Sequence, residues 1–573
     1  MNQSEQINSM LNSDDFETVI SGLTLLESLI DSEETLYEYI PCHNCSSIED
    51  IKELFEGEHC GYIALWILGE LASFEVKWVL TITELDLSKN NLVELPESLE
   101  NLTALECLIL NNNQLSVFPE SIAALTRLTN LDISAIQLAQ LPESIGQLTQ
   151  LKTLHIGGNV LTSLPEAIQD LSQLQYFVLE YNQFTSFPKC ITSCSQLTTL
   201  ICSLNQITSL PKSIDKLSQL HNLKLTFNQL TSIPETIGHL TQLKTLEINH
   251  NQLTELPATI GSLTQLQTLN ADDNKLTEIP EAIQKASQLE TLELYKNELI
   301  SLPESLNNLS QLKTLKLDDN KIASLHGSFG KLSRLMTLTL SFNELTELPN
   351  SFEDLSALIN LELGQNRFES LPESISKLTQ LNHLALDFNL LTSLPDSFGN
   401  LTQLKLLSLN QNQLTSLPQS FEHLTQLNEL SFVGNNLECT SKQRKTFTQK
   451  LLSFFFEPLK PQNPYHLIGK LTELETLNLN HNMMMSLPDS FENLTQLETV
   501  HIESNNLTFI PGWLEHLSEL KTLNLHNNRL TSLPDFFGKL TQIETLDLQR
   551  NRLSDSEKEN IKTMMSHVKN LSL

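Results

Sequence analysis

Residues 83–105 read TELDLSKNNLVELPESLENLTAL, and this pattern returns every 23 residues almost to the end of the 573-residue chain. Leucines at alternating positions, as in Leu85 and Leu87, indicate a short strand whose alternate side chains face a core. A fixed asparagine then marks the register of each repeat. It stands at Asn90, Asn113, Asn159, Asn182, Asn205, Asn228, Asn251, Asn274, Asn297, Asn320, Asn343, Asn366, Asn389, Asn412, Asn435, Asn482, Asn505, Asn528 and Asn551. Such periodicity is typical of a solenoid, in which each repeat buries its apolar face against its neighbours.

The asparagine and a proline six residues later define the rest of the repeat. A buried amide can satisfy backbone groups that a turn leaves unpaired, each of which would otherwise cost about 1–3 kcal/mol. We therefore expect the stacked asparagines to form a ladder. The proline opens sequences such as Pro119-Glu-Ser-Ile, which predict a short helical turn, because proline suits the first helical position and an acidic residue opposes the helix dipole.

The motif LxxLxLxxNxL resembles the leucine-rich repeat, and its 23-residue form is similar to the intracellular class found in Ras-binding scaffold proteins and in many long bacterial repeat proteins. This resemblance covers most of the chain. It implies an α/β fold, a leucine-rich repeat solenoid curved as a horseshoe, with a parallel β-sheet on the concave face and short helices or turns on the convex face. It also implies that the concave face carries the partner.

Departures from the period predict how the chain is divided. The expected parts are a helical N-terminal cap at 1–80, a repeat block at 81–437, an irregular basic helix with a degenerate repeat at 438–470, a second repeat block at 471–553 and a helical C-terminal cap at 554–573. In the degenerate repeat, Leu451, Phe454 and Phe456 suit the strand positions. Ile136 replaces one ladder asparagine, which sequence drift in a single repeat explains more simply than a function does.

The formal net charge of −34 argues against nucleic acid and anionic membranes as partners, because binding to them draws on clustered lysine and arginine. A basic partner is easier to accommodate. Part of the charge has a structural origin, since glutamates such as Glu97 recur at the start of the helical turn. The sequence has no stretch typical of a signal peptide or membrane span, and its eight cysteines are scattered. We therefore expect a cytoplasmic protein.

Signatures of catalysis are missing from the sequence, which contains no GxxxxGK[ST], GxSxG or HExxH motif, so we expect neither an enzyme nor a cofactor. Two clusters are candidate metal sites. One is Cys42, His43, Asn44 and Cys45 with His59 and Cys60, where the second half has awkward spacing and ordinary cysteines in a helical cap are the alternative. The other is His481, His501, Glu503, His526 and Asp547 on the concave face, where a metal or pH-sensitive contact competes with simple solvation.

Outward-facing positions in three successive repeats supply a candidate binding surface. They carry apolar and aromatic residues, which have no packing reason to face solvent and are common at interaction sites. The residues are Tyr176, Val178, Tyr181, Ile201, Leu204 and Phe227. The alternative is that these side chains stack along columns and only stabilise the sheet.

An acidic stretch follows this apolar patch. Its residues are Glu247, Asp272, Asp273, Glu293, Asp318 and Asp319, with Lys296 and Lys316 among them. An apolar patch beside acidic residues predicts a protein partner that presents an apolar knob next to basic residues. The charges by themselves also fit a solvated face that keeps the protein soluble.

The sequence thus supports two main hypotheses for function. The first is a non-enzymatic, cytoplasmic scaffold that binds a protein partner on the concave face. The second is an exported bacterial effector or surface protein that binds a host or neighbouring-cell protein. A metal-dependent cap at residues 1–80 is a third hypothesis and depends on the cysteine cluster.

Overall fold

The computed structural model describes residues 3–13, 15–30, 32–40, 45, 47–55, 59–436 and 464–573. The chain forms two compact units. Unit 1 comprises Met1–Leu276 and Lys285–Leu289, and unit 2 comprises Thr277–Gln284 and Glu290–Leu573.

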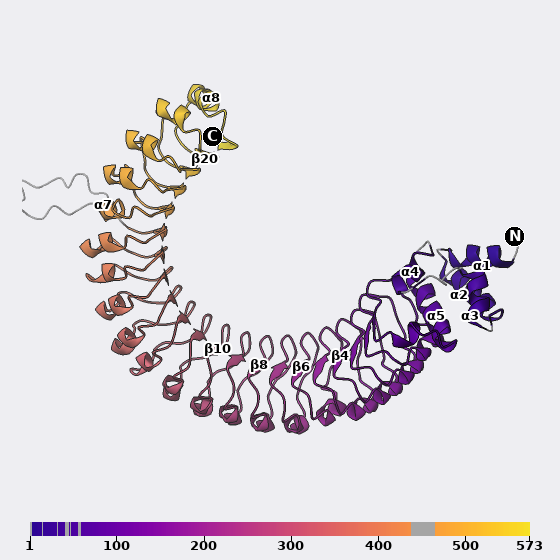
Figure 1. Ribbon diagram of the computed structural model, residues 1–573. Coiled ribbons are helices and arrows are strands. Elements are labelled where there is room, and N and C mark those ends of the chain that lie inside the picture. The colour runs from indigo at the N-terminus through magenta and orange to yellow at the C-terminus, as the bar shows by residue number, and fades with distance from the viewer. Residues whose placement is uncertain are drawn as a thin grey trace, which may run out of the picture. The chain divides into compact units, whose positions relative to one another are not determined.

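Short helices precede the repeats in unit 1 (Figure 1). They are α1 (Gln3–Leu11), α2 (Phe16–Glu27), α3 (Glu33–Tyr39), α4 (Ile48–Lys52) and α5 (Cys60–Ser73). Helix α2 begins after Asp15, whose carboxylate accepts a hydrogen bond from the backbone N–H of Thr18 at 3.1 Å. None of the described helices combines the length and apolar character that a membrane-spanning segment needs.

Helix α5 joins the cap to the first repeat by packing on the 3₁₀ turn Glu97–Asn101. The approach is close, because a Cβ atom added to Gly69 would lie 2.4 Å from the backbone oxygen of Ser98. Ser98 donates a hydrogen bond from its hydroxyl to the carbonyl oxygen of Trp66, and the amide of Asn101 donates to that of Gly69, each at 3.2 Å. The cap therefore contacts the first repeat through the turn of that repeat.

Each repeat contributes a strand of three residues, and neighbouring strands are parallel. In unit 1 the strands are β1 (Glu84–Asp86), β2 (Cys107–Ile109), β3 (Asn130–Asp132), β4 (Thr153–His155), β5 (Tyr176–Val178), β6 (Thr199–Ile201), β7 (Asn222–Lys224), β8 (Thr245–Glu247) and β9 (Thr268–Asn270). The central residue of each strand is buried, and residues 23 apart lie opposite each other, as Leu223 and Leu246 do.

Unit 2 continues the same pattern of parallel strands. They are β10 (Thr291–Glu293), β11 (Thr314–Lys316), β12 (Thr337–Thr339), β13 (Asn360–Glu362), β14 (His383–Ala385), β15 (Leu406–Ser408), β16 (Glu429–Ser431), β17 (Thr476–Asn478), β18 (Thr499–His501), β19 (Thr522–Asn524), β20 (Thr545–Asp547) and β21 (Asn570–Ser572). In both units the 3₁₀ turns lie on the opposite side of the repeat from the strand (Figure 1). We call the other side the strand face. The predicted α/β solenoid with a parallel sheet is confirmed.

The asparagines form the expected ladder, and Asn251 shows how it works. Its side-chain oxygen accepts a hydrogen bond from the N–H of Leu230 in the preceding repeat, and its amide nitrogen donates to the carbonyl oxygens of Leu225 and Ile248, each at 3.0 Å. One side chain thus satisfies three backbone groups and links two repeats. Ladder asparagines within the arrays are buried, whereas Asn90 and Asn551 near their ends are half-buried.

The residue before each ladder asparagine has a left-handed backbone, with φ between 48° and 69°. This conformation disfavours side chains in general and β-branched ones most of all. The position is accordingly occupied by glycine, small, polar, aromatic or γ-branched residues, and by no valine, isoleucine or threonine in the described repeats. We call it the left-handed position. The repeat motif alone does not reveal this position, because no single residue type recurs there.

The 3₁₀ turns are capped from the neighbouring repeat. The proline lies just before the turn in an extended conformation, not at the first helical position as expected, and the glutamate is the first residue of the turn. Glu120 accepts from the N–H of Ser144, and Glu373 accepts from the N–H groups of Asp396 and Ser397, at 3.0–3.3 Å. A glutamate therefore caps the next turn in the stack, which explains a recurring part of the negative charge.

The break in the period lies between β16 and β17. These strands pair directly, with Glu429 opposite Thr476, so the sheet passes from one to the other without an intermediate strand. The degenerate strand expected at Leu451, Phe454 and Phe456, and most of the basic stretch, lie outside the described residues. Helix α7 (Pro464–Ile468) contacts the turns on both sides of the break.

The C-terminal segment contains more than the expected helix. Helix α8 (Asp555–Met564) begins at Ser554, whose hydroxyl accepts from the N–H of Glu557 at 3.2 Å. Strand β21 then pairs with β20, so a further strand covers the last repeat. The motif Asn570-Leu-Ser is too short to have been recognised as a strand from its pattern.

We expect Asn251→Ala to lower the free energy of unfolding by about 3 kcal/mol or more, because three buried backbone groups lose their partner. Hydrogen exchange at the N–H of Leu230 should accelerate at the same time. Gln252→Ala, which changes the exposed neighbouring residue, is the control and should leave both measurements nearly unchanged. Equal stability of the two variants would contradict the role of the ladder.

Hydrogen bonding, first from the hydroxyl of Ser397 and then from two N–H groups, lowers the pKa of Glu373 below its ordinary value. The carboxylate should therefore stabilise the fold above its ordinary pKa, and this contribution should disappear as the pH falls through the lowered value. An NMR titration should find the lowered pKa in the native chain and a pKa closer to the ordinary value in Ser397→Ala, which loses the hydroxyl but keeps the two N–H donors. An ordinary pKa of Glu373 in both chains would contradict the capping of one repeat by the next.

Candidate functional site

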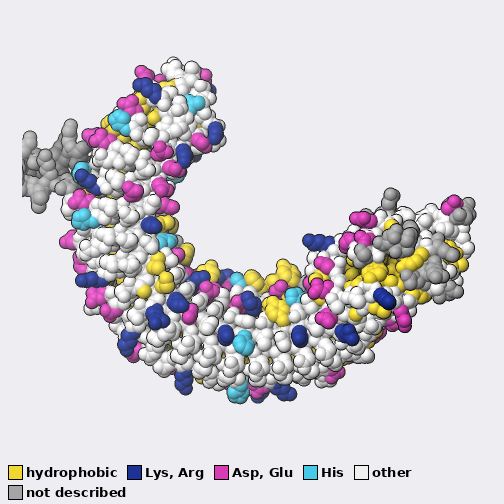
Figure 2. Space-filling model, in the orientation of Figure 1, with side chains coloured by type: hydrophobic (Ala, Val, Ile, Leu, Met, Phe, Trp, Pro, Cys, Tyr) yellow, Lys and Arg dark blue, Asp and Glu magenta, His cyan; other side chains and the backbone are white. Residues whose placement is uncertain are grey.

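The predicted apolar residues lie on the strand face of unit 1. Tyr181 and Phe227 are 64% and 48% exposed, whereas Tyr176, Ile201 and Leu204 are partly exposed. Figure 2 shows hydrophobic side chains on this face, near β4 to β8. We call these five residues the apolar strip.

Val178 does not belong to this surface, because it is only 6% exposed. It lies in register between His155 on one side and Ile201 on the other, and the ring of His155 stacks on that of Tyr176 with centroids 5.4 Å apart. These larger neighbours surround the small Val178 side chain. The sequence placed it correctly on the outward side of the strand but could not show that its neighbours bury it.

Three residues of the apolar strip occupy the left-handed position. Tyr181, Leu204 and Phe227 have φ values of 55–56°. Each donates its backbone N–H to a carbonyl oxygen of the next repeat, that of Ser203, Thr226 or Asn249, at 2.8–3.1 Å. The side chains therefore project from a fixed backbone at equal intervals of one repeat. Such fixed anchors lose little backbone entropy when they bind a partner.

Phe227 is followed along the array by a residue that the sequence analysis overlooked. The ring of His250 stacks on that of Phe227, with centroids 4.0 Å apart and an angle of 8° between the planes. The Nδ1 atom of His250 lies 2.9 Å from a carboxylate oxygen of Asp273. All three residues are at the left-handed position, so reading that column would have revealed the contact. They connect the apolar strip to the acidic residues of unit 1.

The other acidic residues of unit 1 are less available than predicted. Glu247 forms an ion pair with Lys224 at 2.9 Å, and Asp273 is engaged by His250. Asp272 is half-buried. The prediction of a freely acidic flank did not take into account Lys224, which lies 23 residues before Glu247 and neutralises it.

The predicted acidic residues of unit 2 have different surroundings. Glu293 forms an ion pair with Lys316 at 2.6 Å. Asp318 accepts hydrogen bonds from the hydroxyl of Thr339 and, at 2.7 Å, from the N–H of Ser341. Burial raises its pKa, although these hydrogen bonds oppose the shift. Asp318 therefore stabilises the neighbouring repeat, and only Asp319 of this group is fully exposed.

The metal candidates are only partly covered by the structure. Cys42, His43 and Asn44 lie outside the described residues. In the part of the chain that is described, no group of three or more His, Cys, Asp or Glu side chains is placed to hold a metal ion.

The second cluster lies on the strand face of unit 2. His526 is 3.6 Å from Asp547, and Glu503 accepts a hydrogen bond from the amide of Asn524. Burial lowers the pKa of His501, with Glu503 acting in the opposite direction. These residues therefore form separate local contacts with their neighbours.

Family models cover most of the repeats. The model described as "Leucine-rich repeat region" matches residues 64–200, 202–318 and 327–457. Two further models described as leucine-rich repeats match residues 473–494 and 495–553. A search of curated proteins returned no match.

Solved structures with a similar fold come from bacteria and plants. A leucine-rich repeat protein of Leptospira interrogans is 30% identical, with a TM-score of 0.58, and the match covers 78% of this chain and 95% of that one. The Arabidopsis receptor kinase HAESA, solved with the peptide hormone IDA and the co-receptor SERK1, is 28% identical, with a TM-score of 0.61 and coverage of 84% and 85%. The ectodomain of the Arabidopsis receptor kinase GASSHO1, solved with CASPARIAN STRIP INTEGRITY FACTOR 2, is 28% identical, with a TM-score of 0.54 and coverage of 86% and 64%.

We expect Phe227→Val to be less stable than Phe227→Leu by about 1 kcal/mol or more, because β-branching is disfavoured at φ 55° whereas Leu204 shows that leucine fits. Both variants remove the ring that stacks on His250, so the comparison isolates the backbone effect. Chemical denaturation measures it. Equal stabilities would mean that the left-handed position does not restrict which residues a binding surface can use.

Proposed function

The chain belongs to the leucine-rich repeat family, and we propose that it is a non-catalytic scaffold that binds a protein partner on the strand face of unit 1. The observation that carries the proposal is the apolar strip. Its residues are exposed although the core does not need them there, and their backbone is fixed by the neighbouring repeat. Exposed aromatic anchors on a rigid support are typical of protein interfaces.

The similar structures support this role by analogy. HAESA was solved with a peptide hormone and GASSHO1 with CASPARIAN STRIP INTEGRITY FACTOR 2, so related repeats serve as binding platforms in those proteins. Because repeat folds bind many different partners, the partner of this chain is inferred from the residues on its own surface.

The surface fits a partner that inserts an apolar or aromatic side chain between Tyr181 and Phe227. A basic residue beside that side chain can approach Asp273, which already contacts His250. Because Glu247 is paired with Lys224, a basic partner has to compete for it. We therefore assign most of the affinity to apolar contacts and a smaller part to charge.

The second candidate role is that of an exported bacterial effector or surface protein that binds a host or neighbouring-cell protein. The 30% identity to a leucine-rich repeat protein of Leptospira interrogans supports the bacterial part of this alternative. Both roles use the same surface and differ in where the partner is found. Fractionation of the producing cells and their medium with an antibody against the chain separates them.

The test of the binding face is affinity capture from source-cell lysate, followed by measurement of the dissociation constant for each captured protein. In the double variant Tyr181→Gly, Phe227→Gly, the side chains are removed while glycine retains the left-handed backbone. We expect this variant to weaken binding by at least about 2 kcal/mol, or roughly thirtyfold, as for hot-spot residues.

Gln365→Gly is the matched control, because Gln365 is exposed at the same position of a repeat in unit 2. It should leave binding unchanged, and both chains should keep their melting temperature within a few degrees. Unchanged affinity in the double variant would place the partner elsewhere. A large loss of stability would instead identify the strip as structural.

A further inference from the structure

The first strand of unit 1 has an open edge. Strand β1 pairs with β2 through its odd-numbered residues, since the carbonyl of Thr83 accepts from Cys107 and the N–H of Leu87 donates to Ile109. Backbone groups of successive strand residues point to opposite sides, so those of Glu84 and Asp86 point away from β2. Among the described residues, no other strand pairs with β1.

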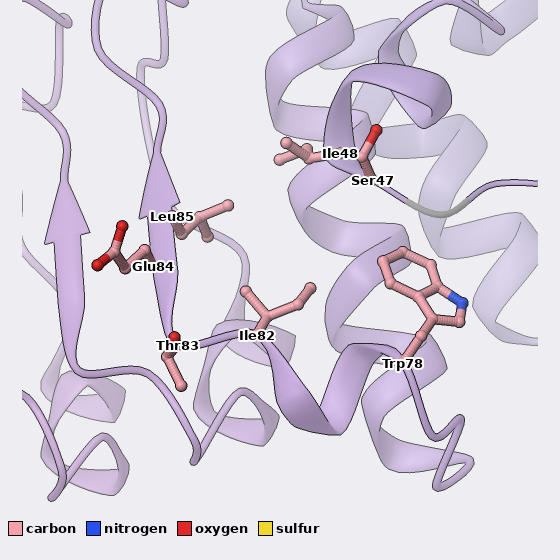
Figure 3. Close-up of a pocket in the computed structure, with 7 residues that line it drawn as sticks. All are labelled: Ser47, Ile48, Trp78, Ile82, Thr83, Glu84 and Leu85. Atoms are coloured by element: carbon pink, nitrogen blue, oxygen red, sulfur yellow. The ribbon is translucent and has the colours of Figure 1, made fainter.

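A pocket adjoins this open edge, and its volume is about 340 Å³. It is lined by Ser47, Ile48, Trp78, Ile82, Thr83, Glu84 and Leu85. Figure 3 shows the side chains of Ile48 and Leu85 pointing toward each other from α4 and β1, with Ile82 and Trp78 on the lower side. The volume falls in the range typical of ligand sites, and the lining is mostly apolar with polar groups at the strand.

The charges at the edge are acidic. Glu84 and Asp86 are exposed, and two hydrogen bonds from Ser88, assisted by Lys52, lower the pKa of Asp86 so that it stays ionised. Lys52 itself is paired with Glu49 at 3.0 Å. The edge therefore combines unpaired backbone groups, an apolar pocket and negative charge that attracts a basic segment.

We propose that the open edge of β1 and the adjoining pocket bind an extended segment of a partner protein that carries an apolar side chain between basic residues. The segment adds a strand to β1, through hydrogen bonds to the backbone of Glu84 and Asp86. Its apolar side chain enters the pocket beside Trp78 and Ile82, and its basic residues meet the two carboxylates. This site is separate from the apolar strip and does not depend on the function proposed above.

A second copy of this chain fits the edge less well than a basic segment. Two copies paired edge to edge would bring Glu84 and Asp86 of both chains together, and like charges on paired strands destabilise the pairing. The second copy is therefore treated as a competing outcome of the test.

The probe is the peptide acetyl-Thr-Lys-Phe-Lys-Thr-amide, in which the phenylalanine and the two lysines point to opposite faces of an added strand. It is compared with versions in which both lysines are glutamate or the phenylalanine is alanine. Binding to the full chain is followed by NMR at the Trp78 indole and by hydrogen exchange at the N–H groups of Glu84 and Asp86. We expect the lysine peptide to perturb Trp78 and protect both N–H groups. Each altered peptide should bind at least tenfold more weakly.

The double variant Glu84→Lys, Asp86→Lys should reverse the preference, so that the glutamate peptide binds better than the lysine peptide. A misfolded variant would not produce this reversal. Glu429→Lys is the matched control, because Glu429 is an exposed residue that starts β16, whose two sides are both paired, and it should not change the preference.

Three results would overturn the proposal. The first is a lysine peptide that perturbs Tyr181 and Phe227 but not Trp78, which would place it on the apolar strip. The second is a chain that sediments as a dimer and becomes monomeric in Glu84→Lys, which would make a second copy the occupant. The third is a failure of all peptides to protect Glu84 and Asp86. The Tyr181→Gly, Phe227→Gly variant should bind the lysine peptide normally, which separates this test from that of the proposed function.

Discussion

The buried asparagine ladder is the constraint on which the rest of the structure depends. Most of these asparagines bond to backbone groups of two repeats, as Asn251 does, and so fix the turn that follows the strand. That turn requires a left-handed residue immediately before the asparagine. The ladder therefore decides which backbone positions face solvent on the strand face, and which residue types these positions accept.

Much of the net negative charge has a structural role. A chain with a charge of −34 suggests a uniformly acidic surface, but many of its carboxylates have structural partners. A glutamate at the start of a turn, such as Glu373, accepts hydrogen bonds from the next repeat, and Asp318 accepts one from the backbone N–H of Ser341. Glu247 forms an ion pair with Lys224. The charge left for a partner is local, and the exposed carboxylates at the edge of β1 belong to it.

The sequence predicted the features that repeat with a strict residue requirement. Alternating leucines predicted the strands, the recurring asparagine predicted the ladder, and the proline and glutamate predicted the turns. It did not predict the burial of Val178, the stacking of His250 on Phe227 or the ion pair between Glu247 and Lys224, because each depends on a residue 23 positions away. Comparing columns across repeats would have shown the last two. Strand β21 had too few residues to give a pattern.

The position of a strand within an array determines how it can recognise a partner. Inside each array, both edges of a strand are paired, so a partner there meets only side chains, among them those at the left-handed position. Residues at that position can vary widely as long as they are not β-branched, which leaves recognition free to change without disturbing the ladder. Within the described residues, β1 pairs along one edge, which leaves the backbone of Glu84 and Asp86 open to the extended segment proposed above. Interior repeats thus suit selection by side-chain shape, whereas the terminal strand suits selection of an extended segment.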